Sequence, residues 1–249
     1  MSISANEIKK VRSLSEKKFR DRLGLFCVEG EKMVDEAMNS RFNVSTVYRR
    51  DEIGEQAMAR MSMLSSPSPV LAVLHKPVDI NIQKGTDLSS YIDKPGLYLA
   101  LDTIRDPGNL GTILRIADWF GISAVFAAPD TVDVFNPKVV QATMGAIFRV
   151  RFHYADVPSL CQAALAAGGN VYGTFLDGTD MYTMDINPGK DSSSVIVIGN
   201  ESSGISDEVA GLVSDRLYIP PYPKDDTGSE SLNAAIATAI TVAEFRRRL

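Results

Sequence analysis

The sequence has few of the residues on which several classes of site depend. Its two cysteines, Cys27 and Cys161, lie far apart in apolar surroundings, and its two histidines, His75 and His153, have no partner at metal or triad spacing. This pattern excludes a disulfide framework and the usual zinc spacings, and it suits a reducing cytoplasm. We expect two buried, inert thiols and no metal.

Long apolar runs and several ligand-binding loops are also missing. No stretch approaches the roughly 20 apolar residues of a membrane-spanning helix, and the first ten residues lack the apolar core of a secretory signal. No G-x-G-x-x-G follows a strand, and neither G-x-x-x-x-G-K-[ST] nor G-x-S-x-G occurs. These absences argue against a membrane protein, a dinucleotide-binding enzyme, a P-loop nucleotide triphosphatase and a serine hydrolase. We expect a cytoplasmic protein.

Charge is unevenly distributed along the chain. The net charge is −5, yet the first 22 residues carry seven basic side chains against three acidic ones. Such an arm is compatible with RNA binding, because phosphate contact is a local property of a surface. The alternative is a solvated helix face. The basic residues that could contact RNA are Lys9, Lys10, Arg12, Lys17, Lys18, Arg20 and Arg22.

The first 75 residues form the pattern of a small α/β unit. Apolar residues at helical spacing predict one helix over 4–22. The strands and further helices of this unit are predicted at 25–28, 44–48 and 70–74, and at 29–38 and 51–64. A polar stretch with prolines and glycines follows over 76–95, and it is typical of a linker.

From residue 96 to residue 249 strands and helices alternate regularly. Strands are predicted at 97–102, 123–128, 150–154, 171–176, 195–199 and 216–220, and helices at 109–120, 137–146, 157–167 and 229–248. Strands that are apolar throughout, separated by helices, predict a parallel sheet covered on both faces. The last helix is rich in alanine and almost uncharged, so we expect it to be buried on most sides, against another subunit.

Three polar segments follow strand ends, where open parallel sheets place their ligands. Arg115 lies in an apolar helix that follows the turn 106–108, Glu201 lies in a glycine-containing turn after a strand, and Asn233 opens the last helix. Each segment taken alone is also compatible with ordinary structure: a salt-bridged arginine, a strand-to-helix turn, or a helix cap.

Taken together and in this order, the segments resemble the motifs of the SpoU/TrmH family of RNA ribose 2′-O-methyltransferases, in the SPOUT superfamily. The pattern N-x-G-x-x-x-R-x-A-x-x-F-G is met over 109–121, G-N-E-x-x-G-[IL]-S over 199–206, and I-P followed by S-L-N at 219–220 and 231–233. The stretch 136–150 resembles a further family motif. The N-terminal unit, with F-x-V-E-G-x-x-x-V-x-E-A at 26–37, is similar to the family's L30e-like substrate-binding domain.

The resemblance implies a fold that patterning alone would not predict. The C-terminal segment of the parallel sheet domain would pass through a loop as a trefoil knot, a rarity among proteins. The domain would bind S-adenosylmethionine and form a homodimer. The implied cofactor contacts are Thr174, Phe175, Gly199, Asn200, Gly204, Ile219 and Leu232. The loop 221–230 is longer and more acidic than the family pattern.

The implied catalytic residues are Asn109, Arg115, Glu201, Ser231 and Asn233. Because an arginine is effectively always protonated, we expect Arg115 to bind the RNA phosphate and stabilise the developing alkoxide. Glu201 and Asn109 would orient Arg115 and the ribose, and Ser231 and Asn233 would complete the polar rim.

The resemblance favours ribosomal RNA as substrate, and transfer RNA is the alternative. Three other functional interpretations stay open at this point. The chain could methylate a base, it could be a non-catalytic RNA-binding relative, or it could be a sugar- or nucleotide-binding α/β enzyme. The motifs favour ribose over base, and the intact Asn109, Arg115, Glu201 and Asn233 speak against a non-catalytic relative.

Overall fold

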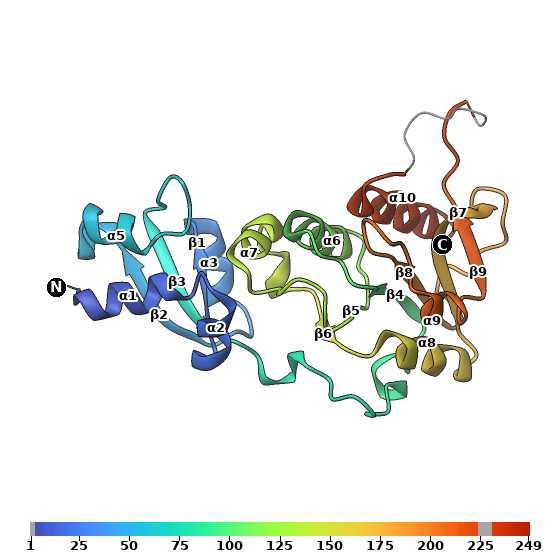
Figure 1. Ribbon diagram of the computed structural model, residues 1–249, viewed down its shortest axis with the longest axis horizontal. Coiled ribbons are helices and arrows are strands. Elements are labelled where there is room, and N and C mark those ends of the chain that lie inside the picture. Colours follow the sequence, from blue (N-terminus) through green and yellow to red (C-terminus); the bar gives the residue numbers. More distant parts are fainter. Residues whose placement is uncertain (1–2, 224–230) are drawn as a thin grey trace. The chain divides into compact units, whose positions relative to one another are not determined.

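The computed structural model describes residues 3–223 and 231–249. The chain forms two compact units, and Figure 1 labels most of their helices and strands. The N-terminal unit consists of Met1–Val78 together with Asp133–Arg149, and the C-terminal unit consists of Asp79–Val132 together with Val150–Leu249. Each unit is described by itself.

The N-terminal unit is built on a small antiparallel sheet. Its strands are β1 (Leu25–Glu29), β2 (Val44–Arg49) and β3 (Val70–His75), and β3 lies between the other two. Its helices in the first part of the chain are α1 (Ala5–Ser13), α2 (Lys17–Leu23), α3 (Glu31–Met38), α4 (Arg50–Ile53) and α5 (Glu55–Met61). Met58 and Met61 of α5 are fully buried against the sheet residue Leu71, so both methionines are core residues.

Two helices that the sequence predicts as continuous are interrupted. The predicted helix 4–22 ends at Ser13 and resumes at Lys17, and the predicted helix 51–64 is divided at Gly54. Gly54 has a φ of 86°, which no α-helical residue can adopt, so α4 must end there. Periodicity spans both pairs of helices because the apolar faces continue across each break.

The segment Asp133–Arg149 packs within the N-terminal unit, although the sequence assigns it to the domain that begins at residue 96. It carries α7 (Pro137–Thr143) and the short 3₁₀ helix η3 (Ala146–Phe148). The ring of Phe135 lies 4.5 Å from that of Phe26, and the ring of Phe148 lies 5.3 Å from that of Phe42. Aromatic packing of this kind explains why the segment Asp133–Arg149 belongs to the N-terminal unit.

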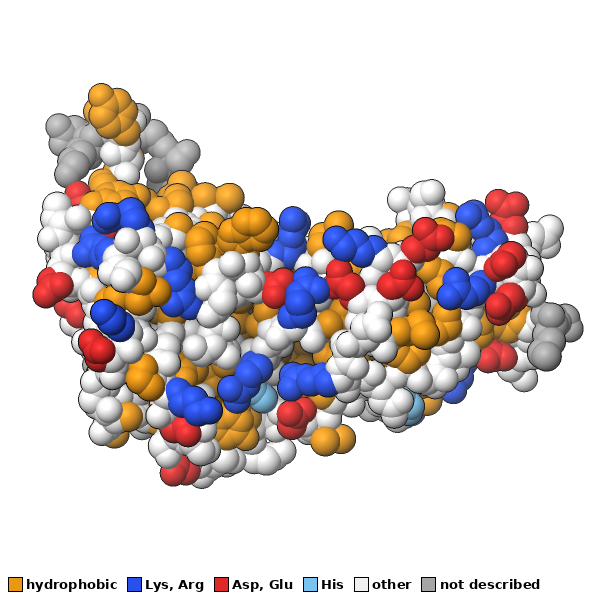
Figure 2. Space-filling model, turned by 180° about the vertical axis from the view of Figure 1, so that it is seen from behind, with side chains coloured by type: hydrophobic (Ala, Val, Ile, Leu, Met, Phe, Trp, Pro, Cys, Tyr) orange, Lys and Arg blue, Asp and Glu red, His pale blue; other side chains and the backbone are white. Residues whose placement is uncertain are grey.

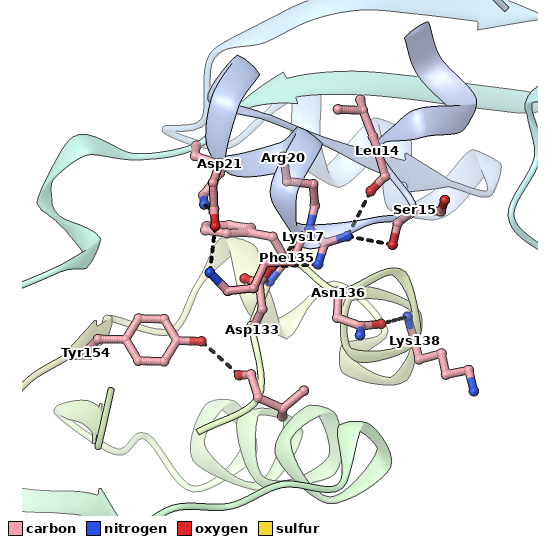
Figure 3. A network of polar contacts seen from close by, with 12 residues as sticks. Leu14, Ser15, Lys17, Arg20, Asp21, Asp133, Phe135, Asn136, Lys138 and Tyr154 are labelled. Carbon is pink, nitrogen blue, oxygen red and sulfur yellow. Dashed lines mark hydrogen bonds and ion pairs between the residues drawn. The ribbon is translucent and has the colours of Figure 1, made fainter. Parts of the chain in front are cut away.

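A buried ion pair fixes the start of that segment (Figure 3). The Nε and Nη2 atoms of Arg20 donate to Asp133 at 2.9 and 2.7 Å, and Nη1 donates to the carbonyls of Leu14 and Ser15 at 2.8 Å each. Arg20 is only 2% exposed. The prediction that Arg20 contacts RNA is therefore wrong, because its guanidinium is buried and its donors are used inside the unit.

The C-terminal unit is built on an all-parallel sheet of six strands. Their order is β6-β5-β4-β8-β7-β9. Their bounds are β4 (Gly96–Leu101), β5 (Ala124–Ala127), β6 (Phe152–Tyr154), β7 (Asn170–Asp180), β8 (Ser193–Ile198) and β9 (Asp215–Tyr218). The predicted α/β class, with a parallel sheet preceded by a small domain, is confirmed.

Helices cover both faces of this sheet. The helices of the unit are α6 (Pro107–Trp119), α8 (Val157–Ala166), α9 (Asp207–Ala210) and α10 (Ala234–Arg247). Val171 of β7 shares a core cluster with side chains of α8 and α9, whereas the next residue, Tyr172, places its ring 5.0 Å from that of Phe245 in α10. Consecutive strand residues point to opposite faces, so α8 and α9 cover one face and α10, which packs beside α6, covers the other.

The polar stretch predicted as a linker belongs largely to the C-terminal unit. It contains the 3₁₀ helices η1 (Val78–Ile80) and η2 (Ser89–Tyr91). Leu88 and Ile92 are 3% and 1% exposed and lie in the core cluster of α8, and Asn81 forms a β-bridge with Tyr154. Two apolar side chains in a polar stretch give too weak a pattern to be read from sequence. Among the residues described, no helix is long and apolar enough to cross a membrane.

We predict that Arg20→Ala lowers the free energy of unfolding by about 3–5 kcal/mol, the range expected when one partner of a buried pair is removed and the other charge stays buried. Chemical denaturation followed by circular dichroism measures this change. Lys18→Ala is the matched control, because Lys18 is exposed and its ion pair with Glu16 lies at the surface. Equal stability of the two variants would contradict the structural role of Arg20.

Candidate functional site

The Glu201 carboxylate joins the loop after β8 to the start of α6. It accepts hydrogen bonds from the backbone amides of Arg105 and Asp106 at 3.2 and 3.1 Å, and from Nδ2 of Asn109 at 3.0 Å. The loops after β4 and β8 meet because these strands are adjacent and parallel, so their carboxyl ends lie at one edge of the sheet. Two of the predicted segments therefore lie together.

The start of α6 differs from the predicted start at Asn109. The side chain of Asp106 accepts a hydrogen bond from the Asn109 amide at 2.8 Å, and Pro107 occupies the first turn. An aspartate cap followed by proline is a strong helix start. Asn109 consequently lies inside the first turn, where its side chain is free to face Glu201.

Asn109 extends the contact to the third predicted segment. Its Oδ1 accepts a hydrogen bond from Nδ2 of Asn233 at 2.8 Å, and Oδ1 of Asn233 caps α10 by accepting from the amides of Ala235 and Ile236 at 3.0 and 3.3 Å. Asn109 is 7% exposed. The chain Glu201–Asn109–Asn233 thus connects three segments that lie far apart in the sequence.

The pKa of Glu201 lies below its usual value. Partial burial raises it, but the hydrogen bonds from the Asn109 side chain and from backbone amides, including those of Asp106 and Arg105, together outweigh burial. Glu201 is therefore a carboxylate at neutral pH, and it acts as an acceptor for three N–H groups.

The loop after β8 is a tight turn that needs glycine. Asn200 and Gly204 exchange backbone hydrogen bonds at 2.9 and 3.0 Å, and Gly204 has a φ of 70°. A Cβ at Gly199 would lie 2.7 Å from the Gly204 carbonyl oxygen and would overlap the backbone of Ile205. Nδ2 of Asn200 donates to the Thr103 carbonyl at 2.7 Å, which ties the turn to the loop after β4.

A cavity of about 360 Å³ lies beside this turn. It is lined by the loops after β4, β5 and β8, namely by Asp102, Thr103, Arg105, Asp130, Asn200, Glu201, Ser202, Ser203, Gly204 and Ser206. Asp102, Arg105 and Asp130 were not among the predicted site residues. Asp102 is buried at the end of an apolar strand, where its Oδ2 accepts from the Ser206 amide at 2.7 Å. A carboxylate ending an apolar run was a signal that could have indicated it.

Arg115 and Ser231 are not brought into the hydrogen-bonded chain. Arg115 lies on an exposed part of α6, and Ser231 is exposed before α10. Within residues 3–223 and 231–249 neither side chain forms a hydrogen bond or an ion pair. The predicted acidic loop 221–230 falls mostly outside the described residues.

The predicted cofactor residues follow the ends of β7, β8 and β9. Thr174 and Phe175 stand where the pairing of β7 with β9 is interrupted, since Thr174 and Thr179 both align with Leu217. Phe175 lies under the Arg216 guanidinium at 3.5 Å, and Arg216 in turn pairs with Asp177 at 2.5 Å. Gly199, Asn200, Gly204, Ile219 and Leu232 complete a set of predicted contacts that carries no charge.

The other basic residues of the N-terminal arm are exposed. Lys17 pairs with Asp21 and Lys18 with Glu16, whereas Arg12 donates to the carbonyl of Ser62. On the face shown in Figure 2, basic and acidic side chains are interspersed over the N-terminal unit. RNA contact by Lys9, Lys10, Arg12, Lys17, Lys18 and Arg22 stays a prediction.

The predicted burial of the two thiols is confirmed. Cys27 and Cys161 are buried, and burial raises the pKa of both, that of Cys161 to about 12. In the part of the chain that the structure describes, no group of three or more histidine, cysteine and acidic side chains is placed to hold a metal ion.

We predict that Gly199→Ala destabilises the protein by about 1–3 kcal/mol, because the added methyl overlaps backbone that cannot move aside. Urea denaturation measures the loss. Gly211→Ala is the control, since a Cβ there meets its nearest atom, the Asp207 carbonyl oxygen, at an ordinary 3.5 Å. Unchanged stability of Gly199→Ala would show that the turn is not as tight as described.

Similar solved structures share this fold over the whole chain. An RNA methyltransferase assigned to the TrmH family from Porphyromonas gingivalis is 37% identical, with a TM-score of 0.86 and complete coverage of both chains. An AdoMet-bound rRNA methyltransferase from Sinorhizobium meliloti is 30% identical, with a TM-score of 0.85 and coverage of 100% of this chain and 97% of that one.

Curated relatives carry related names. The 23S rRNA (guanosine(2553)-2′-O)-methyltransferase RlmP of Bacillus subtilis is 29% identical over 260 residues, which cover 98% of each chain. The mitochondrial rRNA methyltransferase 3 of Homo sapiens is 26% identical, over 93% of this chain and 69% of its own length.

Two family models match the chain. An MRM3-like substrate binding domain matches residues 5–76, and the SpoU rRNA Methylase family matches residues 96–243, which is more than half of the chain. The resemblance read from the motifs is confirmed: the chain belongs to the SpoU rRNA methylase family.

Proposed function

We propose that the chain transfers a methyl group from S-adenosylmethionine to a ribose 2′-hydroxyl of ribosomal RNA. The observation that carries this proposal is the series of hydrogen bonds from Asn109 to Glu201 and from Asn233 to Asn109. These bonds bring the three family motifs to one edge of the sheet. The names of relatives that match nearly the whole of this chain support ribosomal RNA as the substrate.

The residues at the ends of β7, β8 and β9 fit S-adenosylmethionine. The interruption of pairing after Thr174 leaves backbone there without a strand partner, and Phe175 and Leu232 add apolar surface for an adenine ring. The predicted contacts include no cation, and the nearby Arg216 is balanced by Asp177, so a positive sulfonium is not repelled. When bound, the cofactor supplies an electrophilic methyl group.

The protein's own residues position the RNA and the reacting oxygen. Arg115, exposed on α6, binds an RNA phosphate and stabilises charge that develops on the ribose oxygen, while the proton leaves to solvent or phosphate. Glu201 and Asn109 fix the start of α6 and hence the placement of Arg115. Asn233 and Ser231 form the polar rim at the start of α10.

We predict that Arg115→Ala lowers the rate of methyl transfer by about 10²–10³, the cost of one donor that acts in the transition state. Arg115→Lys should restore little, because an ammonium lacks the planar fork of a guanidinium. Single-turnover transfer to RNA from cells without the gene measures the rate, and calorimetry should show an unchanged affinity for S-adenosylmethionine. Near-normal transfer by Arg115→Ala would remove Arg115 from the reaction.

We also propose a homodimer through α6 and α10. The helices run parallel, since Asn233 bonds Asn109 near their starts and Arg246 donates to the Phe120 carbonyl near their ends at 2.8 Å. Their free surface exposes Trp119 and Ile236, which are 85% and 51% accessible. An apolar surface of this kind suits an isologous contact with a second copy.

Ile236→Glu is predicted to convert the dimer to monomer in light scattering at micromolar concentration. Ala235 of α10 is unsuitable for this test because it is only 3% exposed within the subunit, so a charge there would disturb the subunit itself. Lys190→Gln serves as the control, because Lys190 is exposed and lies outside these helices. A wild-type monomer at this concentration would refute the dimer.

The trefoil knot is part of the proposal. β9 is the edge strand beside β7, yet α10 returns to pack against α6, the helix that follows β4. This return of α10 to the helix that follows β4 is what a chain that passes through a loop would require, and it supports the knot. Continuous experimental density from residue 219 to residue 234 would show whether the chain threads the loop after β8.

A further inference from the structure

The cavity beside the turn 199–204 is lined by two charged side chains, those of Asp130 and Arg105, that form no hydrogen bond or ion pair with any described residue. We propose that this cavity receives the base of the target nucleotide and selects guanine through Asp130 and Arg105. This inference rests on the proposed function, and it names the nucleotide on which that function acts.

The carboxylates lining the cavity differ in what they already bind. Glu201 accepts three N–H groups, and Asp102 accepts the Ser206 amide at 2.7 Å. Asp130 is exposed to the cavity and forms no hydrogen bond or ion pair with any described residue, and the same holds for the Arg105 side chain. Asp130 therefore offers both carboxylate oxygens to a ligand, and Arg105 offers its guanidinium.

Backbone hydrogen bonds hold these two groups on neighbouring loops. The amide of Thr131 donates to the Ala128 carbonyl at 2.9 Å, which closes a turn with Asp130 at its tip. The next amide, of Val132, donates to the Ile104 carbonyl at 2.9 Å. This hydrogen bond holds the turn that carries Asp130 beside Ile104, the residue that precedes Arg105. Both side chains therefore border the cavity from backbone that hydrogen bonds hold in place.

An aspartate and an arginine together complement guanine among the four RNA bases. Guanine presents two adjacent donors, N1–H and the N2 amino group, which a carboxylate can accept with both oxygens. It also presents O6 and N7, the acceptor pair that arginine binds in its commonest base contact. Uracil offers one ring N–H between two carbonyls, and adenine and cytosine place an acceptor where guanine N1 donates, so each leaves one charged group unsatisfied.

The position of the cavity separates it from the proposed cofactor site. Its walls come from the loops after β5, β4 and β8, whereas Thr174, Phe175, Ile219 and Leu232 lie at β7, β9 and α10. Only Asn200 and Gly204 of the predicted cofactor residues line it. Glu201 borders the cavity and also belongs to the chain with Asn109 and Asn233, so a nucleotide with its base here has its ribose toward the reacting groups.

Family membership does not decide the base, because relatives are named both for guanosine and for uridine. The first experiment incubates the full-length protein and labelled S-adenosylmethionine with ribosomal RNA from cells without the gene, and then separates the nucleosides. We expect the label only in 2′-O-methylguanosine. Label in another 2′-O-methylnucleoside would overturn the guanine inference and leave the proposed function standing, whereas RNA without label would overturn both.

The second experiment tests the two residues at the mapped site. A synthetic RNA carries guanosine or inosine at the target, and inosine lacks only the N2 amino group. Loss of a hydrogen bond to a charged group should lower kcat/KM of the wild type on inosine about 10–100-fold. Asp130→Ala should be slow on guanosine and should not distinguish the two RNAs. Arg105→Ala should lower kcat/KM while the guanosine preference remains.

Asp191→Ala is the matched control, because Asp191 is an exposed carboxylate of the same unit that does not line the cavity. It should keep both the rate and the preference of the wild type. A wild type without preference, or a preference that survives in Asp130→Ala, would overturn the assignment. Calorimetry adds a further check: a tenfold loss of S-adenosylmethionine affinity in Asp130→Ala would assign the cavity to the cofactor instead.

Discussion

The site depends on the carboxylate of Glu201, which accepts three hydrogen bonds. Glu201 lies in a turn after β8, and it holds the amides of Arg105 and Asp106 and the side chain of Asn109. One of these donors, the Asp106 amide, belongs to the residue that caps α6, and at the start of a helix backbone amides have no partner within the helix and negative charge is favourable. The same contacts lower the pKa of Glu201, so its charge persists to a more acidic pH than that of an unperturbed glutamate.

The hydrogen bonds to Glu201 also position the residues that α6 and α10 carry. Asn109 passes the contact to Asn233, which caps α10, and the two helices then lie side by side along one face of the sheet. Arg115 on α6 and the exposed apolar residues Trp119 and Ile236 are carried into position by the same pair of helices. Catalysis and dimerisation are thus proposed to share one structural support, so a change at Glu201 should be felt by both.

The sequence predicts the six strands of the C-terminal unit well, because each is an apolar run between helices. It also predicts the meeting of Asn109, Glu201 and Asn233, although that step depends on the family motifs and not on periodicity. The sequence does not predict features that depend on a single contact between residues far apart in the chain. The burial of Arg20 depends on an ion pair with Asp133, more than one hundred residues away. Asp130 and Arg105 border one cavity only because the Val132 amide donates to the Ile104 carbonyl and so joins the two loops that carry them.

The most direct test of this account is a double-mutant cycle between Glu201→Ala and Arg115→Ala, measured by single-turnover methyl transfer at saturating S-adenosylmethionine. If Glu201 acts by holding the helix that carries Arg115, the two losses are strongly non-additive. After Glu201→Ala, removal of Arg115 should then cost only a few-fold more, where alone it costs about 10²–10³. Losses that multiply in full would show that Glu201 and Arg115 act independently, and they would contradict the account.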